Sequence, residues 1–379
     1  MRLLADFSSQ TGIVGNAQVF GSQGAPNSLS TVPTFINNGF VFERYGLAIY
    51  NVVPQNITLA DYKANKNNVQ NASTWNYGYL QKLSHYQNSN PNFRFMLTLA
   101  YPPAWLTFDN TTTGVPSDMA VWSDIVMKIS LYLKQFASVR YIEVWNEPGG
   151  QFLTIRASPY VNHTAAYMEI YYHTVQGVRA AGLSADIGGP AAGSLDLTLV
   201  DAMLSNSSIS GDIAFLSFHS YDNNLDVDAS NLAALRAVAG THGRSSIPVF
   251  LTEWNYAYYV KTLNDPLNSR STDAISYVGR RLTNMLQSGY AGASIFTMSA
   301  PLTNDTTMMG LNGLYLNNTF TPKAQTFRLM SSILGLGLGS SQIMRTIFNS
   351  AVITTTVAAI NSADSTAAGD APATVRKRA

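Results

Sequence analysis

Two segments decide the fold of this chain: Tyr141-Ile142-Glu143-Val144-Trp145-Asn146-Glu147-Pro148 and Val249-Phe250-Leu251-Thr252-Glu253-Trp254-Asn255. Each is an apolar run, rich in β-branched residues, that ends in a carboxylate beside aromatic and amide side chains. Strands of an α/β barrel present their chemistry at their C-terminal ends. The two segments therefore predict a barrel with Glu147 and Glu253 at its mouth.

Strand-like and helix-like segments alternate through most of the chain, which is typical of βα units around a parallel sheet. Short, nearly continuously apolar runs predict seven strands buried on both faces, at residues 40–50, 93–100, 141–145, 185–188, 213–218, 249–252 and 293–298. An eighth is expected near Phe7 or at residues 14–20. Amphipathic spacing predicts helices at residues 121–133, 160–181 and 272–287, the last two ending before Gly182 and Gly289. Eight strands favour a (β/α)8 TIM barrel over an open, doubly wound sheet.

The end of the chain departs from this pattern. We expect residues 1–335 to form the barrel, with a last helix at 324–334, and residues 336–361 to form a short β-like extension around a Val/Thr-rich run at 350–360. Residues 362–379 are rich in Ala, Ser, Asp and Pro and then basic, so we expect a disordered tail. The glycine-rich run at 335–339 lacks a preceding strand and the third glycine of a phosphate loop, and a connector is expected there instead.

Composition restricts the partners. Of the 379 residues 46% are hydrophobic, enough for a large core, while only 12% are charged and the net charge is +1. We therefore expect neither nucleic acid nor an anionic membrane as a partner, and no apolar run is long enough to span a membrane. Cysteine is absent, which excludes disulfides and thiolate metal ligands.

The polar, weakly charged surface favours secretion. The apolar part of residues 1–6 is too short to be a signal peptide, so we expect that a signal peptide has been removed. Seven Asn-x-Ser/Thr sequons agree, although a chain so rich in these residues also generates them by chance: Asn56, Asn71, Asn110, Asn162, Asn206, Asn304 and Asn317.

A pair of carboxylates can hydrolyse a glycosidic bond if one protonates the leaving oxygen and the other, about 5 Å away, attacks the anomeric carbon. A lone glutamate at a strand end is more often a surface ion-pair partner, but two in matching contexts favour catalysis. Asn146 precedes Glu147 and can bind a sugar hydroxyl, and Trp254 follows Glu253 and can wall the pocket. Glu143 lies four residues before Glu147, roughly 13 Å deeper in the barrel. We expect it to pair with a buried arginine such as Arg44 and to be structural.

Ser217-Phe218-His219-Ser220-Tyr221 is predicted to end another strand, where Tyr221 can orient the nucleophile and His219 can bind a hydroxyl; ordinary packing is the alternative. No histidine spacing indicates a metal, and no Gly-x-Ser-x-Gly motif indicates a serine hydrolase. Aromatic residues also follow the strands, and they either stack on sugars or pack loops: Tyr101, Trp105, Phe152, Trp254, Tyr256, Tyr258 and Tyr259.

These motifs resemble clan A retaining glycoside hydrolases, most closely family 39, which contains β-xylosidases and α-L-iduronidases. The resemblance follows the order of the chain through Trp75-Asn76-Tyr77, Pro102-Pro103-Ala104-Trp105, Glu143–Pro148, Ile187-Gly188-Gly189-Pro190-Ala191, Phe218–Tyr221 and Leu251–Asn255. It implies that Glu147 is the acid/base, Glu253 the nucleophile, Asn146 a contact of the sugar 2-hydroxyl and Tyr221 the partner of the nucleophile. It implies no cofactor.

Two features depart from the family. Its eighth strand usually presents a tryptophan, and this chain has Phe296, which we expect at the floor of the sugar-binding subsite and which leaves the sugar identity open. Its barrel is normally joined to a β-sandwich, of which we expect only the short extension.

The sequence therefore predicts a retaining glycosidase acting on a neutral plant-type sugar, with β-xylosidase favoured. An endo-acting glycanase, a β-glucosidase and an α-L-arabinosidase remain alternatives. An α-L-iduronidase would need cations for a uronate, and Arg156, Lys261 and Arg270 form no recognisable cluster. The alternative of another class is a carbohydrate-binding protein on a glycosidase scaffold.

Overall fold

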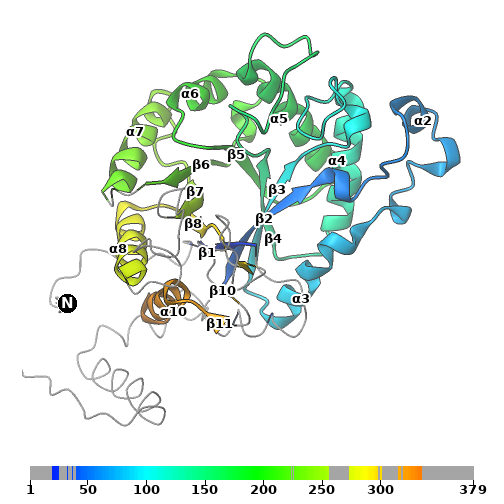
Figure 1. The fold of residues 1–379 in the computed structure, drawn as a ribbon. Helices are drawn as coiled ribbons and strands as arrows, with labels where there is room; N and C mark the ends of the chain where they lie inside the picture. Colours follow the sequence, from blue (N-terminus) through cyan, green and yellow to red (C-terminus); the bar gives the residue numbers. More distant parts are fainter. Residues whose placement is uncertain are drawn as a thin grey trace, which may run out of the picture.

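The computed structural model describes residues 19–24, 32, 36, 40–222, 224, 226–255, 273–297, 299–300, 315–316 and 319–334. Eight parallel strands, β1 to β8, close into a barrel in chain order, with helices around the outside (Figure 1). The predicted TIM barrel is confirmed.

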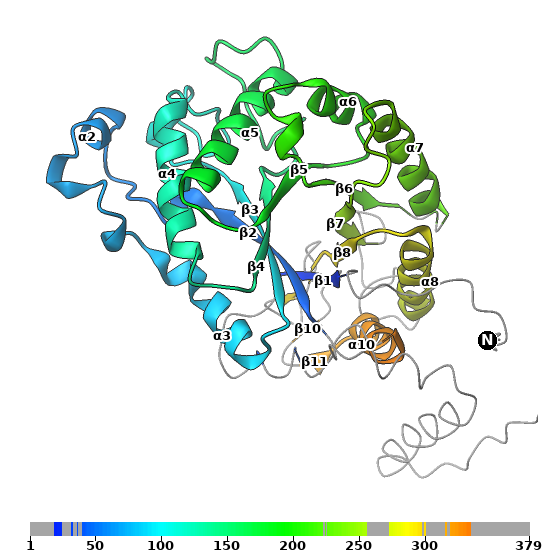
Figure 2. The ribbon, with the colours of Figure 1, turned by 180° about the vertical axis from the view of Figure 1, so that it is seen from behind.

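The barrel strands are β1 (Val19–Gln23), β2 (Phe42–Ala48), β3 (Arg94–Ala100), β4 (Val139–Val144), β5 (Asp186–Ala192), β6 (Phe215–Tyr221), β7 (Val249–Asn255) and β8 (Gly292–Ile295). The helices are α2 (Leu59–Lys63), α3 (Gln81–Ser89), α4 (Met119–Leu133), α5 (His163–Ala180), α6 (Leu197–Ser205), α7 (Val227–Thr241), α8 (Asp273–Ser288) and α10 (Pro322–Leu334). Helix α2 projects from one side of the barrel in both views (Figures 1 and 2).

Several strands extend further toward the barrel mouth than predicted. β5 and β6 remain paired where the sequence turns to small and polar residues, with Pro190 opposite Ser217 and Ala192 opposite Phe218. Backbone pairing needs no apolar side chain, so hydropathy alone ended these strands too early. β8 is shorter than predicted and ends at Ile295. β1 overlaps the expected run at 14–20 only at its first two residues, and Phe7 lies outside the described residues.

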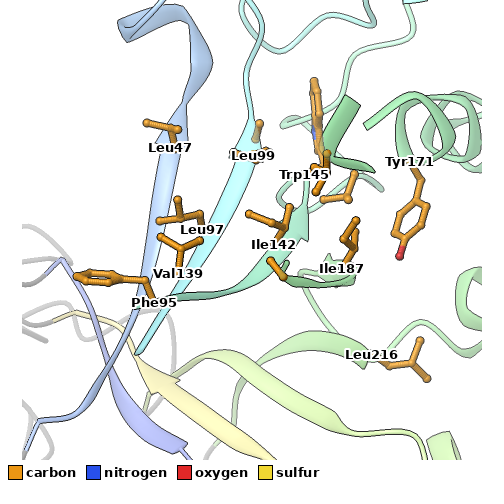
Figure 3. Packing of buried hydrophobic residues seen from close by; sticks show 14 of the residues in the cluster. Leu47, Phe95, Leu97, Leu99, Val139, Ile142, Trp145, Tyr171, Ile187 and Leu216 are labelled. Carbon is orange, nitrogen blue, oxygen red and sulfur yellow. The ribbon is translucent and has the colours of Figure 1, made fainter. Parts of the chain in front are cut away.

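The outer faces of the strands pack against the helices in one continuous core (Figure 3). Figure 3 shows Leu97 and Leu99 of β3, Ile142 of β4 and Ile187 of β5 in this core, all without exposed surface. Tryptophan rings extend the core toward the mouth, where Trp122 of α4 lies 6.1 Å from the ring of Trp145.

The barrel interior changes character along its axis. Near the N-terminal ends of the strands, an apolar layer is formed by the inward side chains of Phe42, Met96, Phe215 and Phe250. Two residues further along the strands, Arg44 follows Phe42 and Thr98 follows Met96, and both are buried. The apolar layer closes the barrel at one end, and a polar layer supports the mouth at the other.

A small sheet of strand order β11-β10-β9 lies outside the barrel; its strands are β9 (Ser299–Ala300), β10 (Tyr315–Leu316) and β11 (Thr319–Phe320). This sheet was not predicted from the sequence. The extension expected at residues 336–361 and the tail expected at 362–379 lie outside the described residues. No helix in the described part of the chain has the length and apolarity needed to cross a membrane.

Candidate active site

Glu147 stands just past the end of β4 in a constrained turn. Both Trp145 (φ 68°) and Glu147 (φ 48°) adopt left-handed backbone conformations, which side-chain-bearing residues rarely occupy outside functional sites. Bonds to the neighbouring strands hold the turn: Trp145 N donates to Leu99 O at 3.0 Å and Glu147 N to Ala191 O at 2.9 Å. The Glu147 side chain keeps 26% exposure, so it faces the mouth of the barrel.

Glu253 lies on β7 and points into the barrel, where its side chain is 10% exposed. Both carboxylate oxygens are engaged. Arg44 Nη1 donates to Oε1 at 2.6 Å, and Tyr221 OH donates to Oε2 at 2.7 Å. The hydrogen bond expected from Tyr221 is therefore present, whereas the contact with Arg44 was not predicted.

His219 lies between the two glutamates. Its Nδ1 is 2.8 Å from Glu147 Oε1 and 3.6 Å from Glu253 Oε2, and its side chain is fully buried. One atom from each of these three residues lies within 4.8 Å of the other two. A metal could in principle approach such a group, but both oxygens of Glu253 already accept hydrogen bonds. The geometry favours two carboxylates that face one reacting centre.

The surroundings of Glu253 keep it ionised. Burial raises its pKa, but His219 and Arg44, together with the hydrogen bonds from Tyr221 and Arg44, outweigh burial and lower the pKa below its usual value. Burial and the adjacent Glu253 charge raise the pKa of Tyr221 well above its ordinary value. Tyr221 therefore remains a neutral donor to an ionised carboxylate.

Arg44 connects the site to the buried polar layer of the barrel. Its Nε donates to Glu143 Oε2 at 2.6 Å, as expected, and Thr98 Oγ1 donates to the same oxygen at 2.8 Å. Nη1 also reaches Gln23 Oε1 at 2.7 Å. Burial lowers the pKa of Arg44, but Glu143 and Glu253 outweigh it and raise that pKa above its usual range. Glu143 and Glu253 thus contact the same guanidinium group. Glu143 therefore lies nearer to Glu253 than we expected of a purely structural residue.

Asn146 is held by the same arginine. Arg44 Nη2 donates to Asn146 Oδ1 at 2.7 Å, and Asn146 Nδ2 donates to Tyr101 OH at 3.1 Å. Burial raises the pKa of Tyr101 to about 12, so its hydroxyl stays protonated. These contacts fix the amide beside Glu147, where it was expected to meet a sugar hydroxyl.

The three aromatic residues predicted to bind substrate have different surroundings. Trp254 of β7 is fully buried, with the Arg281 guanidinium 5.5 Å from its ring centre, so its ring does not wall the pocket, contrary to the expectation from the sequence. Alternation along the strand explains this, because Glu253 points inward. Trp105 stacks on Tyr62 at 5.4 Å and donates to Pro54 O at 2.8 Å. Of the three, Phe296 reaches the site, edge-on to Tyr221 at 6.3 Å.

Two hollows open beside Glu147 on the barrel mouth. The larger, of about 550 Å³, is lined by Glu147, Gln151, Phe152, Gly193, Ser194, Leu195, His219, Ser220, Tyr221, Asp222, Val227 and Asn231. The smaller, of about 310 Å³, shares Glu147, Gln151, Phe152, Gly193 and Ser194 with it. Sequence reasoning missed most of these loop residues, since loops carry no periodic signal. Arg44 was expected from the sequence only as the partner of Glu143, and it follows a second buried charge, Glu43, in β2.

A parallel barrel whose mouth brings an ionised, hydrogen-bonded carboxylate close to a second, more exposed one defines a glycosidase. The family model for glycosyl hydrolases family 39 matches residues 98–373, and the chain belongs to this family. No curated protein matches the sequence.

Solved structures agree on the fold. A glucosidase from Croceicoccus marinus gives a TM-score of 0.63 at 14% identity, over 84% of this chain and 68% of that one. A monomeric β-xylosidase from Caulobacter crescentus CB15 gives 0.59 at 16%, over 83% and 67%. A GH30 endoxylanase from Clostridium papyrosolvens C71 gives 0.54 at 12%, over 83% and 71%. At such identities the likeness shows the fold alone.

Proposed function

We propose that this protein is a retaining glycosidase that acts by double displacement on neutral plant-type glycosides, with β-xylosides favoured. The observation that carries the proposal is the short separation of Glu147 and Glu253, whose nearest oxygens lie within 4.8 Å. Retaining enzymes hold their carboxyl groups about 5–5.5 Å apart, whereas inverting enzymes leave about 6.5–9.5 Å for a water molecule. The different surroundings of the two glutamates support a division of roles.

In the first step the glycosidic C–O bond breaks as Glu147 donates its proton to the leaving oxygen. Glu253 attacks the anomeric carbon and forms a glycosyl ester. In the second step Glu147 takes a proton from water, the water oxygen bonds to the anomeric carbon, and the ester bond to Glu253 breaks. The sugar leaves as a hemiacetal with its original configuration, and both glutamates regain their starting protonation.

The charges near the site support a neutral sugar. Arg44 is the arginine that reaches Glu253 among the described residues, and its donors are taken by Glu143, Gln23, Glu253 and Asn146. Four of the five N–H donors of Arg44 are therefore engaged within the protein, which leaves no pair of donors for a uronate carboxylate. Arg156 is exposed in the β4–α5 connection, and Lys261 and Arg270 lie outside the described residues. A β-xyloside is the first substrate to test and a β-glucoside the second, since proteins with these activities share the fold.

The test is hydrolysis of aryl β-xyloside, β-glucoside, α-arabinofuranoside and α-iduronide by the wild type and by Glu253→Ala. We expect turnover of one neutral glycoside and a loss in the variant of roughly 10⁴-fold or more. Azide should rescue Glu253→Ala with inverted anomeric configuration, because azide enters the space of the missing nucleophile. It should rescue Glu147→Ala with retained configuration, because it then attacks the glycosyl ester.

Retention in both rescues, or full activity of either variant, would contradict the assigned roles. Sugar binding without turnover of any glycoside would identify a carbohydrate-binding protein instead.

A further inference from the structure

The two hollows beside Glu147 lie on one side of the carboxylate pair. Glu147 lines both, and Glu253 lines neither. In a double displacement the proton donor stands next to the leaving oxygen, while the nucleophile approaches from the opposite face of the sugar ring. These hollows therefore receive the leaving group. We refer to their combined lining as the leaving-group site, an assignment that rests on the proposed function.

The walls of the leaving-group site are held in place by the turn that carries Glu147. Trp145 Nε1 donates to Phe152 O at 2.8 Å, which fixes the β4–α5 connection. From the facing β5–α6 connection, Gly193 approaches so closely that a Cβ there would lie 3.2 Å from Glu147 Cδ. The half-buried Phe152 ring, flanked by Gln151 and Ser194, gives the apolar surface and polar rim that a sugar ring requires.

Two aspartates add negative charge to the leaving-group site. Besides Glu147 and His219, which contact each other, Asp222 lines the larger hollow and Asp196 the smaller, and neither hollow is lined by a lysine or arginine among the described residues. Asp196 Oδ1 accepts from Leu199 N and Asp222 Oδ1 from Asn224 N, and these backbone bonds orient the carboxylates without neutralising them. An anionic leaving group would therefore meet the like charges of Asp196 and Asp222.

We propose that the leaving-group site binds an uncharged sugar unit of an oligosaccharide, with Phe152 as its stacking surface, and rejects sugars that carry a carboxylate. The substrates are then neutral oligosaccharides, and chains with a uronic acid next to the cleaved bond are excluded.

Two disaccharides test the effect of charge. Both carry the sugar whose aryl glycoside the enzyme hydrolyses, linked in one to a neutral reducing sugar and in the other to the matching uronic acid. We expect the neutral disaccharide to have a kcat/KM about tenfold higher or more. Asp196→Asn/Asp222→Asn should reduce this preference at least about threefold, because asparagine keeps both backbone bonds and removes the charges. Asp186→Asn, at the other end of β5, removes the same charge and should leave the preference unchanged.

The stacking surface is tested with Phe152→Ala, comparing the neutral disaccharide with the glycosyl fluoride, whose leaving group is a single atom. We expect kcat/KM to fall about tenfold more for the disaccharide than for the fluoride. Tyr172→Ala, an exposed ring on α5, should change the two equally. Equal hydrolysis of the neutral and uronic disaccharides, or equal losses of kcat/KM for disaccharide and fluoride with Phe152→Ala, would overturn this proposal. Neither result would contradict the proposed glycosidase activity. Failure to hydrolyse the glycosyl fluoride would contradict the proposed function and therefore also this inference.

Discussion

Glu253 shares a single buried cation with a second carboxylate. Arg44 lies 2.6 Å from an oxygen of Glu253 and 2.6 Å from an oxygen of Glu143. Because the guanidinium stays charged, each carboxylate affects the other through it. The pKa of Glu253 therefore depends on several neighbours with distinct effects. His219, Arg44 and Tyr221 stabilise the ionised form, and we expect the like charge of Glu143, on the same guanidinium, to oppose it.

This arrangement predicts opposite pH shifts for two conservative variants. Tyr221→Phe removes a hydrogen bond to ionised Glu253, so the pKa of Glu253 rises and the acidic limb of kcat/KM moves up by about 0.5–1 pH unit. Glu143→Gln removes a like charge, so the same limb moves to lower pH. The pH dependence of kcat/KM on the best aryl glycoside measures both shifts.

Tyr171→Phe is the matched control for this pair. Tyr171 is fully buried on α5, and its hydroxyl has no hydrogen-bond partner among the described residues. We expect its removal to leave the acidic limb in place. Shifts of the same sign in Tyr221→Phe and Glu143→Gln would show that Glu143 does not act on Glu253 through Arg44.

The contact between α4 and α5 depends on one glycine. A Cβ at Gly177 of α5 would lie 2.5 Å from Ser123 O and 2.9 Å from the Val126 side chain, so the helices approach too closely for alanine. Gly240 of α7 is exposed, and its Cβ would meet nothing nearer than 3.8 Å. The same substitution therefore has opposite consequences in the two helices.

We predict that Gly177→Ala lowers the free energy of unfolding by about 1–3 kcal/mol, since overpacking exceeds the gain in helix propensity. Gly240→Ala should raise it by up to about 1 kcal/mol, because alanine restricts the unfolded chain and the folded helix accepts it. Urea unfolding of both variants against the wild type measures the difference. Stabilisation by both substitutions would mean that α4 and α5 can move slightly apart without lowering the free energy of unfolding.

Sequence reasoning located the elements better than their ends. Helices with a wide apolar stripe, such as α4 and α8, were predicted within two residues of their observed bounds. Helices α2, α3, α6 and α7 were not predicted. Helix α3, for example, buries only Lys82, Leu83 and Tyr86 in an otherwise polar segment. Trp145 and Glu147 after β4 and Ala191 within β5 adopt left-handed backbone conformations and are held by cross-strand bonds, and neither feature leaves a hydrophobic pattern.

At the site, the motifs identified the strand-end residues for which we propose catalytic roles, but not the contacts between strands. Glu147 and Glu253 were paired correctly in space, and the bond from Tyr221 was anticipated. The double role of Arg44 was missed, because it depends on three strands meeting inside a closed barrel. Phe152 was among the aromatic candidates and lines both hollows, whereas the wall that Gly193 contributes depends on loop conformation, which composition does not determine.

One buried arginine connects strands β6 and β7 with helices α7 and α8. Arg281 of α8 binds both oxygens of Asp228 on α7, at 2.9 and 3.0 Å. It also donates to Ser220 Oγ at the end of β6 and to Asn255 O at the end of β7. The strands that carry Tyr221 and Glu253 are thereby held at a fixed distance from two helices. The stability of the whole barrel and the geometry of the site depend on the same side chain.

Arg281→Met should therefore lower the free energy of unfolding by about 3–5 kcal/mol, because Asp228 is left buried without its partner. Arg281→Met/Asp228→Leu should recover part of that loss, since removing both charges removes the desolvation penalty. Arg179→Met is the control, because Arg179 and Asp212 form an exposed pair 3.6 Å apart whose loss costs at most about 1 kcal/mol. Urea unfolding at neutral pH, with kcat/KM measured on the folded variants, separates stability from geometry. If Arg281→Met were no more destabilising than Arg179→Met, the buried pair would not be what joins β6 and β7 to α7 and α8.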